Sequence, residues 1–166
     1  MRVCFVCLGN ICRSPAAEAL TTHLMSSRPE GQLSGLQVSS AGVGPWHVGE
    51  QPHSHMRAEA QRRGIPVDHR GRQFEAGDFA ELDLVVAMDE GNVEDLRSLA
   101  PDVDSRSKIV RLGAFAPGED GGPAGEQGQD VPDPYGQPPE AFAAMFDQLE
   151  PACRGLLDWL DSGRAQ

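Results

Sequence analysis

Short apolar segments alternate with longer segments of helical character along most of the chain. Four segments have the length and apolar content of buried strands: residues 2–7, 36–40, 82–88 and 108–112. Helical patterns separate or follow them at residues 15–27, 53–63, 91–99 and 139–160. This alternation predicts a three-layer, doubly wound α/β fold, in which a four-stranded parallel sheet with right-handed crossovers carries helices on both faces.

The first predicted strand ends at Cys7, and a short turn joins it to the first predicted helix. Gly9 and Asn10 tolerate positive φ, so the turn can curl with successive amides pointing inward. Ser14 followed by Pro15 is typical of a helix N-cap and first helical position. Ligands of parallel sheets bind at the carboxyl ends of the strands. An anion held in this turn would therefore face unpaired N–H groups and the positive end of a helix.

The same surroundings would make Cys7 reactive, because its thiolate is also an anion. The loop amides, the Ser14 hydroxyl and the charge of Arg13 would together favour the ionised sulfur. A helix dipole alone contributes only ~0.3 to 2 kcal/mol, so several donors are needed. Arg13 presents a planar fork that binds two phosphoryl oxygens at once. The pattern predicts a nucleophile inside a cup for a tetrahedral dianion.

The segment from Cys7 to Ser14 reads CLGNICRS. It resembles the phosphate loop of the low-molecular-weight protein tyrosine phosphatase family, which is Cys, five residues, Arg and then Ser or Thr, close to the N-terminus. The resemblance implies that Cys7 is the nucleophile and that Arg13 holds the phosphoryl group, with the phosphate loop at the end of the first strand. It also implies these phosphate-binding residues: Leu8, Gly9, Asn10, Ile11, Cys12, Arg13 and Ser14.

A second motif, DVPDPYG, spans residues 130–136. It resembles the acid loop of the same family, which implies that Asp133 is the general acid. A phenolate leaves poorly because the pKa of tyrosine is about 10, so a proton donor is needed opposite the nucleophile. Taken alone, the motif is also typical of a surface turn. Gly136 stands where the family frequently has a second tyrosine, which leaves the effect of one absent aromatic side chain open.

The resemblance extends more weakly through the middle of the chain. Residues 38–42, VSSAG, are similar to a family segment in which one serine supports the phosphate loop. Ser39 and Ser40 both fit that role, and we prefer Ser39. The family pattern also implies that His69 supports Asn10 through a hydrogen bond.

Two aromatic residues are expected beside the catalytic pocket. The resemblance places Trp46 and Tyr135 there as walls that would contact a substrate ring. Trp46 fits a partly buried loop position equally well, because tryptophan is rarely buried completely. The segment AMDEGN, residues 87–92, is similar to a family turn in which Asp89 would cap a helix near the site.

The four cysteines have different expected roles. Cys4 and Cys7 are three positions apart on one strand, so their side chains point to opposite faces and form neither a redox pair nor a zinc knuckle. Cys4 and Cys153 are expected in the core. The resemblance implies that Cys12 forms a reversible disulfide with Cys7 under peroxide, which would protect a sulfenic acid from further oxidation. A small buried side chain is the alternative for Cys12.

Chain length and a hydrophobic content of 39% predict one domain over residues 1–166. Residues 116–129 are rich in Gly, Pro and Glu and predict an exposed flexible loop. The chain has 14 basic and 25 acidic residues, and its net charge of −11 argues against nucleic-acid and acidic-membrane partners. Met1 leads directly into a strand, so we expect a cytoplasmic protein without a membrane span, which we take to be a monomer.

His47, His53 and His55 lie close together in the sequence. They lack a carboxylate or cysteine at ligand spacing, so we predict no metal site there. The expected chemistry requires neither a metal nor another cofactor.

These observations predict a protein tyrosine phosphatase. It would hydrolyse phosphotyrosine in proteins or small aryl phosphates through a phosphocysteine, with phosphate as product and competitive ligand. Two alternatives are open. An arsenate reductase of the same fold would need a resolving cysteine pair, and the chain has no cysteine between residues 13 and 152. A non-catalytic phospho-ligand binding module would keep Arg13 but could lack Asp133.

Overall fold

The computed structural model describes residues 1–29, 31–118 and 128–163. Within them, four parallel strands form one sheet in the order β2-β1-β3-β4. The strands are β1 (Arg2–Cys7), β2 (Gln37–Gly42), β3 (Leu84–Ala87) and β4 (Ile109–Arg111). The predicted four-stranded parallel sheet is confirmed, and each predicted strand is present with ends that differ by at most two residues.

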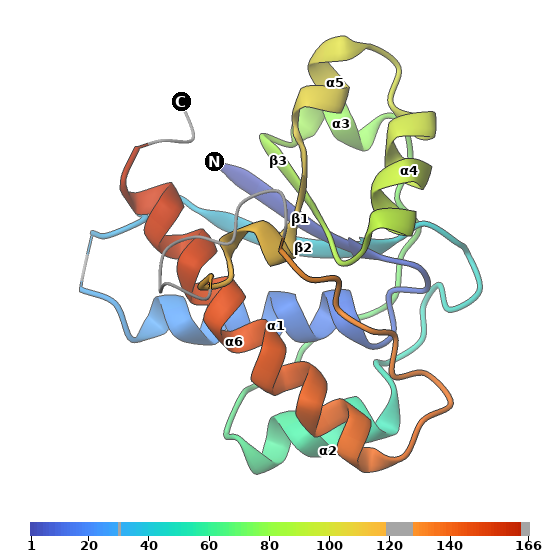
Figure 1. Ribbon diagram of the computed structural model, residues 1–166, viewed down its shortest axis with the longest axis vertical. Helices are drawn as coiled ribbons and strands as arrows, with labels where there is room; N and C mark the ends of the chain where they lie inside the picture. Colours follow the sequence, from blue (N-terminus) through green and yellow to red (C-terminus); the bar gives the residue numbers. More distant parts are fainter. Residues whose placement is uncertain (30, 119–127, 164–166) are drawn as a thin grey trace.

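Helices lie on both sides of the sheet (Figure 1). One layer consists of α1 (Arg13–Ser26), α2 (Ser54–Arg62) and α6 (Pro139–Asp161). The opposite layer consists of α3 (Asp78–Glu81), α4 (Glu90–Leu99) and α5 (Val103–Ser107). A short 3-10 helix, η1 (Leu112–Phe115), follows β4. The predicted three-layer α/β architecture is therefore confirmed.

The alternation of side chains along β1 divides the core into two parts. Phe5 and Cys7 face the α1 and α6 side, whereas Cys4 and Val6 face the α3 and α4 side. Cys4 and Cys7 thus point to opposite faces, as their spacing predicted. Cys153 of α6 is also completely buried, which confirms its expected place in the core.

Helix α6 has one apolar face, whose members recur at intervals of three and four residues. The buried residues of this face are Phe142, Met145, Phe146, Leu149, Ala152, Cys153, Leu156, Leu157 and Leu160. Pro139 occupies the start of the helix, where its missing N–H costs no hydrogen bond. The helix continues through Pro151. This long helix packs mainly against α1 and η1, and it also contacts α2.

One helix boundary and several short elements differ from the prediction. Helix α1 begins at Arg13 with Cys12 as its N-cap residue, so the expectation that Ser14 caps the helix is wrong. The Ser14 hydroxyl instead bonds side chains of the site described below. The sequence pattern also missed α3, α5 and η1, because four or five residues are too few to show a helical period. Most of the predicted flexible loop, residues 119–127, lies outside the described residues.

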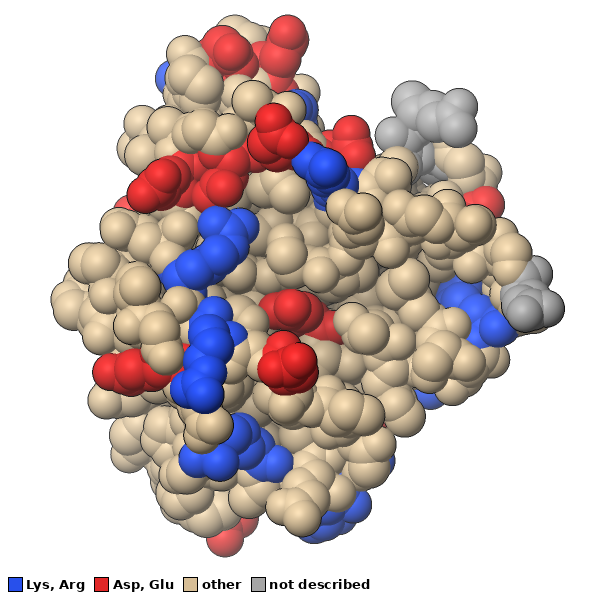
Figure 2. Space-filling view, turned by 180° about the vertical axis from the view of Figure 1, so that it is seen from behind, with Lys and Arg blue, Asp and Glu red and all other residues tan. Residues whose placement is uncertain are grey.

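The surface charge is unevenly distributed. Figure 2 shows a band of Lys and Arg side chains along the face opposite to that of Figure 1, with Asp and Glu beside it. The net charge of −11 therefore does not describe every part of the surface. No helix within the described part of the chain is long and apolar enough to cross a membrane.

Candidate active site

A buried asparagine holds the phosphate loop, residues 7–14. Asn10 has φ 54°, which confirms the predicted positive φ at this position. Its Nδ2 donates to the Oγ atoms of Ser14 at 2.9 Å and Ser40 at 3.0 Å. Its Oδ1 accepts from His69 Nε2 and from the backbone N–H of Arg72, each at 2.9 Å. Every polar atom of the side chain is bonded, and the predicted support from His69 is confirmed.

The serine that supports Asn10 is Ser40, and the preference for Ser39 is wrong. The Ser39 hydroxyl bonds the carbonyl oxygen of Val3 instead, at 3.4 Å. Ser40 is paired in register with Phe5, and Ser39 with Cys4. Partners in a parallel pair point to the same face, so Ser40 shares the face of the phosphate-loop helix and Ser39 does not. The sequence alone could not distinguish the two serines, because both fit the motif and the register of β2 against β1 was not known.

Glu18 on α1 belongs to the same hydrogen-bond network, and the sequence did not reveal it. The Ser40 hydroxyl donates to Glu18 Oε2 at 2.6 Å, and His69 Nδ1 lies 3.1 Å from the same oxygen. The available signal was the spacing from Ser14 to Glu18, since residues four apart share one helix face. An acidic residue at that spacing is common on helices, so it could not have been singled out.

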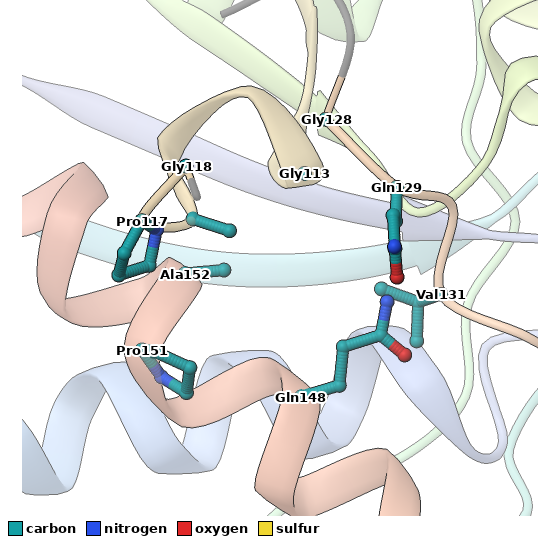
Figure 3. Close-up of a pocket in the computed structure, with 10 residues that line it drawn as sticks. Gly113, Pro117, Gly118, Gly128, Gln129, Val131, Gln148, Pro151 and Ala152 are labelled. Carbon is teal, nitrogen blue, oxygen red and sulfur yellow. The ribbon is translucent and has the colours of Figure 1, made fainter. Parts of the chain in front are cut away.

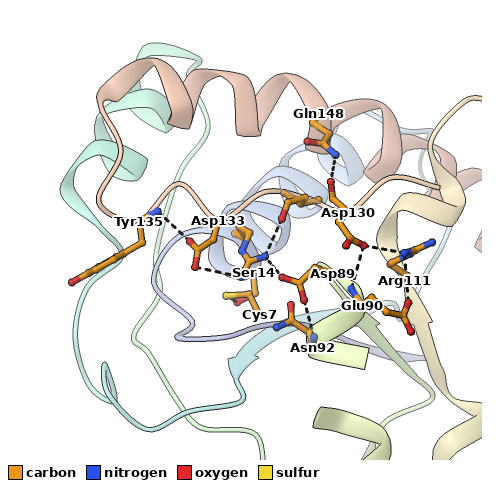
Figure 4. Close-up of polar contacts among 12 residues, drawn as sticks. Cys7, Ser14, Asp89, Glu90, Asn92, Arg111, Asp130, Asp133, Tyr135 and Gln148 are labelled. Atoms are coloured by element: carbon orange, nitrogen blue, oxygen red, sulfur yellow. Dashed lines mark hydrogen bonds and ion pairs between the residues drawn. The ribbon is translucent and has the colours of Figure 1, made fainter. Parts of the chain in front are cut away.

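Cys7 lies at the end of β1 and is only 3% exposed. Its Sγ is 3.0 Å from the Ser14 Oγ (Figure 4). Because the Ser14 oxygen already accepts from Asn10, its own proton is available to the sulfur; the Ala41 carbonyl, at 3.3 Å, is the other acceptor within reach. The Ser14 hydroxyl is thus positioned as a hydrogen-bond donor to the Cys7 sulfur.

Arg13 is buried at the start of α1, and two anchors fix its guanidinium. Its Nη1 donates to Asp89 Oδ2 at 2.5 Å and to the Val131 carbonyl at 2.9 Å. Asp89 also accepts from the backbone N–H of Asn92 at 2.7 Å, which confirms its prediction as a helix cap beside the site. Nη2 lies 3.5 Å from Asp133 Oδ2. Nε is buried and has no partner among the described residues, so a donor is left for a ligand oxygen.

The charge of Arg13 is held by its surroundings. Burial alone would lower its pKa, but Cys7, Asp89 and Asp133 more than offset this effect and raise the pKa above its ordinary value. The guanidinium therefore carries its positive charge in the pocket at physiological pH.

The acid loop, residues 130–136, is attached to the rest of the molecule at its first residues. Asp130 Oδ1 accepts from Arg111 Nη1 at 3.0 Å and from the backbone N–H of Glu90 at 3.2 Å. The Asp130 carbonyl accepts from Gln148 Nε2 at 2.7 Å (Figure 4). Together with the bond from Arg13 to Val131, these contacts place the acid loop beside the phosphate loop.

One pocket of about 410 Å³ brings both loops together. Its lining includes the predicted nucleophile, cation and acid, and both predicted aromatic walls. The residues are Cys7, Leu8, Gly9, Ile11, Cys12, Arg13, Trp46, His47, Asp133 and Tyr135. The side chains of Trp46 and Tyr135 stay largely exposed, at 64% and 56%, so each could receive an aromatic group. His47, which the sequence analysis considered only for metal binding, also lines this pocket.

A larger cavity of about 670 Å³ lies elsewhere, between η1, α6 and the start of the acid loop (Figure 3). Its described lining contains no charged or nucleophilic side chain, so size alone does not identify the site. Among the residues that the structure describes, no group of three His, Cys, Asp or Glu side chains could hold a metal ion.

Cys12 shares the pocket with Cys7, and both are free thiols. Burial, with further contributions from Cys7 and Asp133, raises the pKa of Cys12 to about 12. Cys12 is therefore neutral at physiological pH. Its predicted disulfide with Cys7 stays a prediction.

Known proteins share the sequence pattern and the fold of this chain. A family profile described as low molecular weight phosphotyrosine protein phosphatase matches residues 2–166. The chain belongs to this family. A low molecular weight protein-tyrosine-phosphatase of Streptomyces coelicolor is 41% identical over 94% of this chain and 91% of its own length. The relative PtpA of Staphylococcus haemolyticus is 35% identical over 95% of this chain and 92% of its own length.

Solved structures of the family have the same fold. A protein tyrosine phosphatase from Entamoeba histolytica, crystallised with Hepes in the active site, has a TM-score of 0.87 at 34% identity and covers 99% of both chains. YfkJ from Bacillus subtilis has a TM-score of 0.84 at 35% identity, covering 99% of this chain and 96% of its own. Family membership thus rests on sequence and on fold, and the catalytic roles of individual residues are a separate question.

Proposed function

We propose that this low-molecular-weight phosphatase hydrolyses phosphotyrosine, in proteins or as small aryl phosphates, with Cys7 as nucleophile, Arg13 as phosphate ligand and Asp133 as acid and base. The observation that carries the proposal is the meeting of these three side chains in one pocket. Phosphate itself would be product and competitive ligand. The names of the relatives support a phosphotyrosine substrate.

In the first step the Cys7 thiolate attacks phosphorus opposite the leaving oxygen. The S–P bond forms and the bond from phosphorus to the aryl oxygen breaks, while Asp133 gives its proton to that oxygen. The loop amides and the unpaired Nε of Arg13 hold the remaining phosphoryl oxygens. Asp133 Oδ2 lies 3.5 Å from the guanidinium, which supports its proposed role as the acid.

In the second step the Asp133 carboxylate takes a proton from water as the water oxygen attacks phosphorus. The S–P bond breaks and phosphate leaves. The Ser14 hydroxyl, 3.0 Å from the sulfur, donates to the departing thiolate and stabilises its charge. Asp133 is thereby protonated again and ready for the next cycle.

Two substitutions test these assignments with phosphotyrosine and para-nitrophenyl phosphate in EDTA. Cys7→Ser should abolish turnover while the protein stays folded. Asp133→Ala should lower kcat/KM for phosphotyrosine by about 100-fold or more, and lower it less for para-nitrophenyl phosphate, whose phenolate needs little protonation. Asp104→Ala, at an exposed carboxylate on α5, is the control and should retain wild-type rates.

Phosphate release by Cys7→Ser at the wild-type rate would refute the nucleophile. Equal losses for both substrates in Asp133→Ala would refute the general acid. A wild-type protein that binds phosphate without turnover would be a binding module, and one that requires arsenate and a thiol reductant would be a reductase.

A further inference from the structure

His53, outside the lining of the catalytic pocket, contacts the phosphate loop, the acid loop and α6 and precedes α2. Its backbone N–H donates to the carbonyl oxygen of Ile11 in the phosphate loop at 2.8 Å. Its ring stacks on Phe142 of α6, with centroids 4.8 Å apart and an interplanar angle of 25°. It meets Tyr135 of the acid loop edge to face, at 5.8 Å and 80°. His53 is also the residue that precedes α2.

The helix-capping contact of His53 specifies its protonation state. Its Nδ1 accepts a hydrogen bond from the backbone N–H of His55 at 3.1 Å, which makes it the side-chain cap of α2. Ser, Thr, Asp and Asn usually fill this position, and histidine can do so only while Nδ1 carries no proton. A protonated ring would lose the acceptor and would place a positive charge at the positive end of the helix.

The charged neighbours of His53 also oppose protonation. On α2 these are His55 and Arg57, and in the loop before α2 it is His47, whose Nδ1 lies 2.7 Å from Glu50. The acid loop contributes the phenol of Tyr135, and α6 contributes the uncharged ring of Phe142. Burial, followed by the charges of His55, Arg57 and His47, lowers the pKa of His53 below its ordinary 6.5.

Tyr135 links His53 to the proposed acid. The Tyr135 backbone N–H donates to Asp133 Oδ1 at 3.1 Å. Tyr135 is 56% exposed, and within the described residues its ring contacts the rings of His53 and His47, the latter at 5.9 Å. The ring contact with His53 therefore offers a path by which a change at His53 would reach Tyr135.

We propose that neutral His53 is a positioning residue that holds Tyr135, and through it Asp133, against the phosphate loop, and that protonation of His53 loosens this arrangement. The inference rests on the proposed function. Under this proposal, the activity of the enzyme falls at acidic pH because His53 is protonated, although His53 contacts neither the phosphate nor the Cys7 sulfur.

The kinetic test compares the wild type with His53→Asn between about pH 5 and pH 8. Asparagine keeps an acceptor for the His55 N–H but lacks the ring and cannot be protonated. With a phosphotyrosine peptide, wild-type kcat/KM should exceed that of the variant about fivefold at high pH, and the ratio should approach one near pH 5. The titration of the substrate cancels in this ratio because both proteins act on the same peptide.

A second variant shows whether the effect of His53→Asn comes from the lost titration or from a loss of folding. His53→Phe keeps the ring but neither caps the helix nor titrates, so the ratio of its kcat/KM to that of His53→Asn should not change with pH. His23→Gln removes a histidine in α1, remote from these contacts, and should behave as wild type. A wild-type to His53→Asn ratio that is constant with pH, or equal to one, would overturn the proposal.

A measurement without turnover uses Tyr135, the only tyrosine of the chain. Its ring proton resonances should shift with pH in the wild type, with a midpoint below 6.5, the ordinary value from which the pKa of His53 is lowered. The shift should be lost in His53→Asn and retained in His23→Gln. If it persists in His53→Asn and disappears in His47→Asn, the linkage belongs to His47. If the wild type shows the shift but no turnover, the proposed function fails and this linkage stands.

Discussion

The side chain of Asn10 in the phosphate loop and three side chains outside the loop form a closed ring of polar contacts. Asn10 donates to Ser40, Ser40 donates to Glu18, Glu18 pairs with His69, and His69 returns to Asn10. Asn10 and Ser40 are almost completely buried. A satisfied buried network is rigid, and removing one member leaves the others without partners. The curl of the loop around Cys7 therefore depends on residues that no phosphate would touch.

Ser40→Ala and Ser39→Ala provide a matched test of this ring. Ser40→Ala leaves Asn10 and Glu18 each short of one bond, so we expect a loss of about 1 to 3 kcal/mol in the free energy of unfolding. We also expect a lower kcat/KM, because Asn10 would be held less firmly. Ser39→Ala removes one long bond to the Val3 carbonyl and should cost less than about 1 kcal/mol. Urea unfolding and turnover measure both effects, and equal losses for the two variants would contradict the assignment.

Site residues whose roles depend on neighbours in the sequence could be predicted, whereas those whose roles depend on contacts between distant segments could not. Asn10 and the cap at Asp89 follow from backbone preferences within a few positions. The choice between Ser39 and Ser40 required the register of β2 against β1, which a single strand does not contain. The role of Glu18 could not be predicted, because its contact with His69 depends on how α1 lies relative to the turn after α2, and that arrangement is set by the tertiary structure.

At the scale of elements, α2 is joined to α6 by one arginine as well as by apolar contacts. Arg63, the residue after α2, bonds Glu59 at 2.7 Å, Asp147 at 2.8 Å and the Ala143 carbonyl at 3.1 Å. Its guanidinium also lies 5.4 Å from the ring centroid of Phe146. Glu59 orients this arginine from within α2, so its charge contributes to the contact between the two helices.

Glu59→Gln tests that contribution through its pH dependence. Bonds from Arg62 and then Arg63 lower the pKa of Glu59 from 4.5 to about 2, against the opposing effect of burial. Because the folded-state pKa is depressed, the stabilisation is fully present above 4.5 and is lost as the pH falls toward 2. We expect Glu59→Gln to lower the free energy of unfolding by about 1 kcal/mol at neutral pH and to leave it unchanged near pH 2, the folded-state pKa of Glu59. Glu94→Gln, at an exposed position of α4, should show no such trend, and a pH-independent loss in Glu59→Gln would refute the charge effect.

The elements themselves were predicted in proportion to their length. The pattern of α6 repeats over 23 residues and was located to within one residue at its end. The helices α3 and α5 have only four and five residues, so no helical period could reveal them. Asp102 caps α5, which packs against β4, whereas α3 has no side-chain cap. The start of α1 was displaced from Ser14 because bonds of that hydroxyl to Asn10, Cys7 and the Ala41 carbonyl outweighed its local capping preference.

At the scale of the whole molecule, the phosphate site must work against a net charge of −11. Arg13 and the amides of the phosphate loop act at short range, whereas the carboxylates of the α3, α4 and α5 layer act over longer distances. Salt screens the second effect and hardly changes the first, since the screening length is about 8 Å at 0.15 M ionic strength. Measurements of kcat/KM at low and high salt can therefore separate the long-range effect of the carboxylates from the short-range effect of Arg13 and the loop amides.

Neutralising exposed acids far from the pocket should accelerate capture of a dianionic substrate only at low salt. The triple variant Glu94→Gln, Asp95→Asn, Asp104→Asn changes the net charge from −11 to −8. Three unit charges acting on a dianion over roughly 20 Å contribute about 0.6 kcal/mol at ~10 mM salt and about 0.1 kcal/mol at ~0.15 M. We expect kcat/KM for para-nitrophenyl phosphate to rise up to threefold at the lower ionic strength and to match the wild type at the higher one. A gain that persists at high salt would mean that one of these carboxylates acts at short range, and no gain at low salt would mean that Arg13 and the loop amides alone determine the approach of the substrate.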